Sequence, residues 1–153
     1  MQSQLDQTAV GQSGLYDEDF FEWTRVNGEL LRAGRFEQAD IEHIAEEIED
    51  MGIRDIRALD SRMEVLLAHL LKWRFQPEKR SASWQNTVAV QRTGVARLFA
   101  RYPSLRGRVK PNLFVNYGFA LSRAVRETGL PKNHFPAECP FTVDQILDPE
   151  FLP

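Results

Sequence analysis

Apolar residues recur along most of this 153-residue chain at spacings of three and four positions, the period of a helix that is packed on one side. The longest such stripe begins at Ile41 and continues to Phe75, just before Gln76 and Pro77. Gly52 is its weak point, because glycine costs about 1 kcal/mol relative to alanine inside a helix. The pattern predicts one helix of about 52 Å over residues 41–75. It leaves open whether Gly52 bends or breaks this helix.

Three shorter amphipathic segments are expected beside the long helix. They are Asp17–Ala33, Trp84–Arg101 and Pro111–Thr128, of which the first and last are followed by a glycine that favours a helix end. No stretch shows the strict alternation of a strand. The sequence therefore predicts an all-α fold, a bundle of about four main helices around the long one. An extended proline-rich C-terminal tail follows, in which Thr142–Leu147 are expected to form one or two helical turns.

A chain of this length is most simply one domain. We expect residues 1–14, which are rich in Gln, Ser and Gly, to be a disordered N-terminal tail, and residues 15–153 to form a single helical domain. The core should be built from the apolar stripes, with Trp23, Leu66, Leu70, Val88, Leu98, Tyr117 and Leu121 largely buried.

Charge is strongly segregated along the chain, although the net charge is only −3. Residues 1–60 carry 5 Lys and Arg against 15 Asp and Glu, whereas residues 61–126 carry 13 against 2. A basic segment of this kind suits an anionic partner, and acidic and basic helices can equally pair inside one fold or one dimer. The second interpretation predicts ion pairs between the acidic cluster Glu46–Asp50 and arginines such as Arg80 or Arg92.

Composition favours a cytoplasmic protein. The single cysteine, Cys139, allows no intrachain disulfide, which fits a reducing compartment. The first residues lack the apolar core of a signal peptide, and no run approaches the ~18 apolar residues of a membrane span. We therefore expect no association with a membrane.

Several short words of the sequence occur in an order typical of one bacterial family. They are Tyr16-Asp17, Leu31-Arg32-Ala33-Gly34-Arg35-Phe36, Ala45-Glu46-Glu47-Ile48-Glu49-Asp50-Met51-Gly52, His69-Leu70-Leu71-Lys72-Trp73, and Glu127-Thr128-Gly129-Leu130-Pro131. On these words the chain resembles the domain of unknown function 29 family, bacterial all-helical proteins without an assigned activity. The resemblance covers the chain from Tyr16 onward and supplies no catalytic residues. At His43-Ile44 the chain departs from the Asn-Leu that the family more often has.

The acidic cluster on the long helix is the first candidate site. His43, Glu46 and Glu47 stand at positions i, i+3 and i+4, so their side chains share a face, as metal ligands of helical bundles do. Such bundles draw this motif from two helices, whereas only one is present here. We therefore predict no metal and no cofactor. A solvated acidic face that pairs with arginines is the alternative interpretation.

His69 and Lys72 lie one turn apart among apolar residues and form the second candidate. They would make a polar pocket floor that binds an anion or moves a proton. The alternative is a half-buried histidine whose ring nitrogens bond locally. Together with Glu46 and Glu47 they are the catalytic candidates. On a straight helix Glu47 would lie about 33 Å from His69, so a shared site needs a fold-back of the helix or two subunits.

The third candidate is an anion or ligand site at Arg80, Trp84 and Arg92. Lys79, Arg80 and two serines precede a predicted helix N-terminus, a setting that suits phosphate or carboxylate. Trp84 would offer a flat face for a base. The alternative is a capped helix start in which Trp84 belongs to the core.

Three functions follow from these patterns. The leading prediction is a protein-interaction or self-association module, with a protein partner or a second copy as the ligand. The second is a nucleic-acid-binding protein that uses the basic 72–126 segment. The third is an acid–base or metal-dependent enzyme at Glu46, Glu47 and His69. Because no glycine-rich phosphate loop, Gly-x-Ser-x-Gly or Cys-x-x-Cys motif occurs, the sequence names no reaction.

Overall fold

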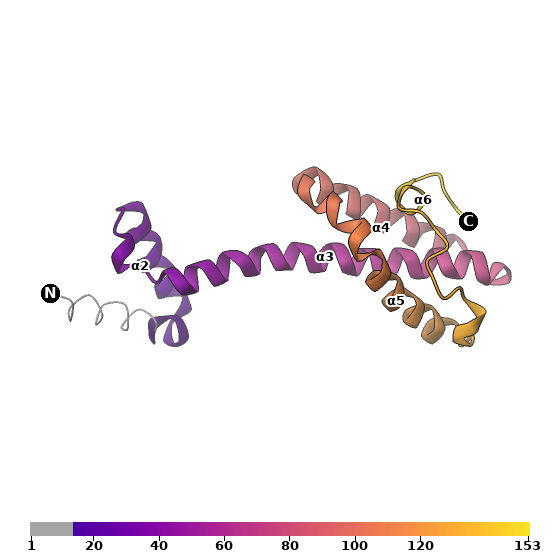
Figure 1. The fold of residues 1–153 in the computed structure, drawn as a ribbon, viewed down its shortest axis with the longest axis horizontal. Coiled ribbons are helices and arrows are strands. Elements are labelled where there is room, and N and C mark those ends of the chain that lie inside the picture. Colours follow the sequence, from indigo (N-terminus) through magenta and orange to yellow (C-terminus); the bar gives the residue numbers. More distant parts are fainter. Residues whose placement is uncertain (1–13) are drawn as a thin grey trace. The chain divides into compact units, whose positions relative to one another are not determined.

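The computed structural model describes residues 14–153. Residues 1–13 lie outside the described part, and with them almost all of the tail expected at 1–14. The described residues contain helices and no strand (Figure 1), so the predicted all-α fold is confirmed. They divide into two compact units, Met1–Ile53 and Arg54–Pro153, and each unit is described by itself. A single domain over 15–153 stays a prediction.

Capping residues determine where the first long element begins and ends. Helix α2 (Phe20–Arg32) starts after Asp19, whose carboxylate accepts a hydrogen bond from the Glu22 N–H at 3.0 Å. Because this cap begins a new helix, the element expected over Asp17–Ala33 starts three residues later, behind the short helical stretch at 14–18. Gly34 adopts a φ of +69°, a left-handed conformation that glycine accepts without strain, and it ends α2 as predicted.

Helix α3 (Ile41–Phe75) is a single element of 35 residues that belongs to both units. It continues through Gly52 without a break, so this glycine does not divide the helix in two. A Cβ atom at Gly52 would meet nothing within 4 Å, so packing does not require glycine there. Residues 41–53 of the helix lie in the first unit and residues 54–75 in the second.

The second unit is a bundle around the C-terminal half of α3. Helix α4 (Ala82–Arg101) and helix α5 (Val109–Thr128) pack on it and are joined by the 3₁₀ turn Pro103–Arg108 (Figure 1). The 3₁₀ turn Pro77–Lys79 connects α3 to α4, and another, Lys132–His134, leads into the C-terminal segment, which contains the short helix α6 (Val143–Leu147). Both main helices begin slightly earlier than predicted.

The core of this unit is centred on α3. Its buried side chains include most of those predicted, namely Leu66, Leu70, Val88, Tyr117 and Leu121, whereas Leu98 is only partly buried. The C-terminal segment also takes part, because Phe135, Phe141 and Ile146 are buried in the same cluster. Burial of this apolar surface fixes the segment against the bundle.

Candidate functional site

A buried hydrogen-bond network in the first unit connects α2 to the start of α3. The Asp40 carboxylate accepts a bond from the Trp23 indole N–H at 3.0 Å, and the same oxygen lies 2.7 Å from His43 Nδ1. Asn27 completes the network: its side chain accepts from the Asp40 N–H at 2.8 Å and donates to the Trp23 carbonyl at 3.0 Å. Asp40 therefore joins two helices as well as beginning one.

Tyr16 covers this network from one side. Its ring stacks on His43 with centroids 4.0 Å apart, and its hydroxyl donates to Glu47 at 2.7 Å. The bond to Glu47, with partial desolvation, raises the pKa of Tyr16 to about 12. The bond to Asp40 raises the pKa of His43 above its ordinary value. Burial by itself would raise the pKa of Asp40, but the hydrogen bonds from His43 and Trp23 outweigh it and hold that pKa low.

The arrangement gives the predicted metal candidates other partners. His43 presents Nδ1 to Asp40, Glu47 holds the Tyr16 hydroxyl, and Glu46 is exposed. Within residues 14–153 no group of three or more His, Cys, Asp or Glu side chains is placed to hold a metal ion. What the site contains chemically is an oriented carboxylate–imidazole pair.

A second polar network lies in the second unit around Lys72. This side chain is only 5% exposed, and its Nζ donates to Glu127 at 2.7 Å and lies 4.9 Å from the centre of the Trp84 ring. Arg123 bonds to Glu64 at 2.8 Å and lies 3.4 Å from Glu127. Burial by itself would raise the pKa of Glu127, but the bond from Lys72 keeps it below the ordinary value. Two predicted residues, Lys72 and Trp84, thus come together here.

His69 lies on the same helix, one turn before Trp73. It is half-buried, and its Nδ1 lies 2.8 Å from the carbonyl oxygen of Val65, one turn earlier. Burial lowers the pKa of His69, and the positive charge of Lys72 lowers it further. The imidazole is therefore neutral at neutral pH. A catalytic role for His69 stays a prediction.

The remaining candidates differ sharply in accessibility. Arg80 is exposed; its guanidinium lies 5.2 Å from the centre of the Trp73 ring, and its Nε donates to the Trp73 carbonyl at 2.8 Å. Arg92 is only 7% exposed and donates to the carbonyls of Ile146 at 2.8 Å and Gln145 at 3.2 Å. Because Arg92 is occupied by the C-terminal segment, it is unsuited to an external anion.

The predicted catalytic group draws on both units. Glu46 and Glu47 lie in the first, whereas His69 and Lys72 lie in the second, so their joint action stays a prediction. The same holds for the expected pairing of the acidic cluster with arginines of the basic segment. Sequence reasoning missed the bond from Trp23 to Asp40 and the bond from Tyr16 to Glu47 in the first unit, and the pairing of Lys72 with Glu127 in the second. The i, i+3 spacing of Asp40 and His43 was an available signal; Glu127 is 55 residues from Lys72 and gave none.

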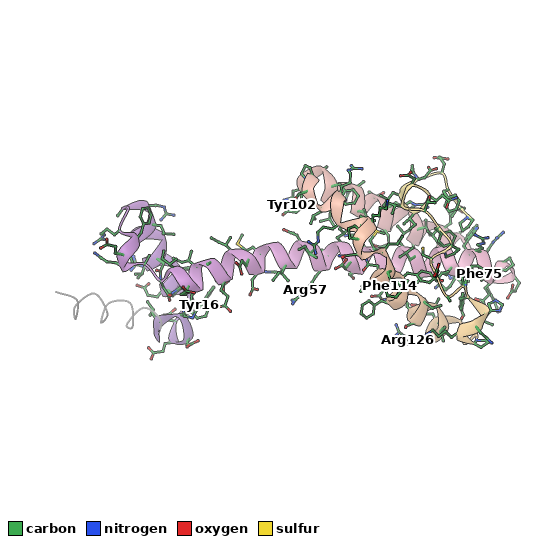
Figure 2. The ribbon with its side chains drawn as sticks, viewed as in Figure 1. Tyr16, Arg57, Phe75, Tyr102, Phe114 and Arg126 are labelled. Carbon is green, nitrogen blue, oxygen red and sulfur yellow. The ribbon has the colours of Figure 1, made fainter. Side chains whose placement is uncertain are left out.

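One face of α5 stands out by its exposure. Phe114 is 82% exposed, Phe119 60% and Val115 54%, and we call these three residues the α5 face. Figure 2 shows the Phe114 ring projecting outward from α5. A hollow of about 550 Å³ adjoins it and is lined by these three residues together with Tyr117, Gly118, Leu121, Ser122, Lys132 and Ala137.

These observations define an all-α protein with two helical units and a buried polar network in each. The chain belongs to the family described as domain of unknown function DUF29, whose model matches residues 15–152. The predicted resemblance is thereby confirmed. No curated protein and no solved structure matches the chain. Across residues 14–153, every helix is too short or too polar to cross a membrane.

Proposed function

We propose that this protein is a self-association module in which two copies pair through the α5 face. The observation that supports it is the exposure of Phe114, Phe119 and Val115 on consecutive turns of one helix. Apolar side chains grouped in this way lose contact with water when a partner covers them. Contiguous exposed apolar patches commonly mark interaction sites.

The relief of the α5 face suits a second copy as the partner. Phe114 and Phe119 are largely exposed and also line the hollow, and a Cβ atom on Gly118 in the same hollow would meet nothing within 4 Å. A two-fold symmetric contact places the same patch on both sides of an interface. A patch with both a projection and a hollow can therefore be complementary to itself. Lys132 is the one charged residue that lines the hollow, so little charge is desolvated.

The area of the α5 face determines how tightly two copies are expected to bind. The three side chains present on the order of 350 Å² per copy, close to half of the ~800 Å² that each partner contributes to a standard interface. The surrounding residues of α5 and of the segment after it would supply the rest. We expect a dimer that forms in a concentration-dependent manner.

The test is a matched pair of variants measured by sedimentation equilibrium over a wide range of protein concentration. Phe114→Ala together with Phe119→Ala should weaken dimerisation by about a thousandfold, because two aromatic anchors at about 2 kcal/mol each contribute about 4 kcal/mol. Phe21→Ala, at a position 78% exposed in the first unit, is the control and should dimerise as the unchanged protein does. A protein that is monomeric at every concentration would refute the proposal, as would equal effects of both changes.

The two other predicted functions stay predictions. Nucleic-acid binding by the 72–126 segment would have to use its exposed basic residues, such as Arg97, Arg101 and Arg108, since Arg92 is buried. An acid–base or metal-dependent enzyme would need Glu46, Glu47 and His69 to act together.

A further inference from the structure

A second hollow, of about 530 Å³, lies between α3 and α4 within the second unit. One face of α4 contributes Val90, Gly94, Arg97 and Arg101, at spacings of four, three and four residues, which places them on successive turns. Helix α3 contributes two residues one turn apart. The full lining is Ala58, Arg62, Ala89, Val90, Thr93, Gly94, Arg97, Leu98 and Arg101. We call this hollow the arginine groove.

Arg62 lies in the groove because the residue of α4 that it contacts, Gly94, has no side chain. A Cβ atom built on Gly94 would overlap the Arg62 guanidinium, so glycine makes the room that this side chain occupies. The Nη1 of Arg62 donates to the Gln91 side-chain oxygen at 3.1 Å, which orients the guanidinium. The Arg62 side chain is therefore already ordered without a ligand, so binding a ligand costs it little further conformational entropy.

The positive charge of the groove is not neutralised from within its unit. Among residues 54–153 the ion pairs join Lys72 and Arg123 to carboxylates, and none involves Arg62, Arg97 or Arg101. Like charges that line one hollow repel each other, and an anion bound between them removes that repulsion.

We propose that the arginine groove binds the phosphate group of a nucleotide-sized ligand. Planar guanidinium groups match phosphate oxygens with paired hydrogen bonds, and the hydroxyl of Thr93 is a further donor. The apolar side chains of Val90 and Leu98 offer contact area for a base or sugar. The volume falls within the range of small-molecule sites. This site uses α3 and α4 and does not rest on self-association through α5.

Isothermal titration calorimetry of the full chain tests the site with adenosine triphosphate and with a short single-stranded oligonucleotide. Arg97→Ala together with Arg101→Ala should weaken binding of whichever phosphate ester binds by about tenfold or more. Arg126→Ala, an exposed arginine on α5 (Figure 2), is the control and should bind unchanged. Binding of the nucleotide alone identifies a free nucleotide as the ligand. Tighter, strongly salt-dependent binding of the oligonucleotide identifies a nucleic-acid backbone. Either result supports the proposal.

Gly94→Ala tests the role of Arg62 without removing any charge. The new methyl group must displace the guanidinium, which is the flexible end of its side chain, while alanine favours the helix. We expect a folded protein, with an unchanged helical circular-dichroism signal, that binds phosphate several-fold more weakly. Binding as tight as in the unchanged protein would show that Arg62 does not hold the phosphate and that the site is wrong.

Three further results would overturn the proposal. One is the absence of binding by either phosphate ester. Another is an equal loss of binding in the Arg126→Ala control. The third is binding of polyglutamate as tightly as of the phosphate esters, with the same loss on changing Arg97 and Arg101, which would make the groove a site for acidic protein segments.

Discussion

Asp40 is a buried carboxylate whose surroundings compensate fully for its burial. It is 9% exposed, yet it has the Trp23 indole and the His43 imidazole as partners for one oxygen and the Asn27 side chain for its backbone N–H. A carboxylate removed from water in this way is costly unless it is bonded. The pair with His43 therefore makes the stability of the first unit depend on pH.

The pKa shifts give the direction of that dependence. The pKa of His43 is raised on folding, so its stabilisation is complete below the unfolded value near 6.5 and is lost as pH rises through the folded pKa. The pKa of Asp40 is lowered, so its stabilisation is present above about pH 4 and is lost as pH falls through the folded pKa. We expect the pair to stabilise the first unit most between about pH 4 and 6.5. Nuclear magnetic resonance titration of the His43 imidazole measures its pKa, and the indole N–H resonance of Trp23 followed during urea unfolding measures the stability of the first unit.

His43→Gln should remove the loss of stability on the alkaline side and leave the acid side in place. His134→Gln, in the second unit, is the control and should leave the Trp23 signal unchanged at every pH. A His43 imidazole that titrates at or below its ordinary pKa would contradict this account.

The secondary-structure elements differ in what holds them in place. Helix α3 has 35 residues and is stabilised by its own hydrogen bonds along its length, whereas α6 has five and is too short to persist alone. A capping box formed by Thr142 and Gln145 begins α6, Ile146 is buried beneath it, and Arg92 bonds to its last carbonyls. The position of α6 therefore depends on the guanidinium of Arg92 as well as on the burial of Ile146.

Arg92→Lys tests this dependence while keeping the charge. Lysine carries its three N–H donors on one nitrogen in place of a planar fork, so it cannot reproduce the two bonds that Nε and Nη2 of Arg92 make to the Ile146 and Gln145 carbonyls. We expect the free energy of unfolding to fall by ~1–3 kcal/mol, together with faster amide exchange in residues 141–153. Arg126→Lys, at an exposed position, should change stability by less than about 0.5 kcal/mol. Unchanged exchange in the C-terminal segment of Arg92→Lys would refute the role of Arg92.

For the molecule as a whole, the two units differ in how much apolar surface they bury. In the described part of the first unit the buried apolar side chains are Trp23, Leu30 and Ala39. The second unit buries six leucine and methionine side chains of α3 alone, together with residues of α4, α5 and the C-terminal segment. Since burial of apolar area is the main stabilising contribution, the second unit should be the more stable.

Native-state amide exchange along α3 measures that difference within one helix. Amides of residues 59–71 should exchange only when the second unit opens. Amides of residues 41–53 should exchange through local opening of the first unit, which requires less free energy. We therefore expect a drop in protection on passing from the C-terminal to the N-terminal half. Uniform protection from Ile41 to Phe75 would mean that the helix opens as a single cooperative element.

The sequence by itself determined most of the helices, because helix formation depends on neighbours three and four positions away. The stripe from Ile41 to Phe75 predicted α3, Gly34 predicted the end of α2, and Leu66 and Leu70 were correctly expected in the core. Local spacing also brought His43 to notice.

Only the tertiary structure decided which parts of those faces are covered. Ile48 and Met51 continue the apolar stripe of α3 but are 64% and 60% exposed. Lys72 can be buried because Glu127, 55 residues later, pairs with it, and Arg92 can be buried because carbonyls of α6 accept hydrogen bonds from its guanidinium. Periodicity shows which face of a helix is apolar, but burial and the pairing of a charge depend on groups that the fold brings from distant positions.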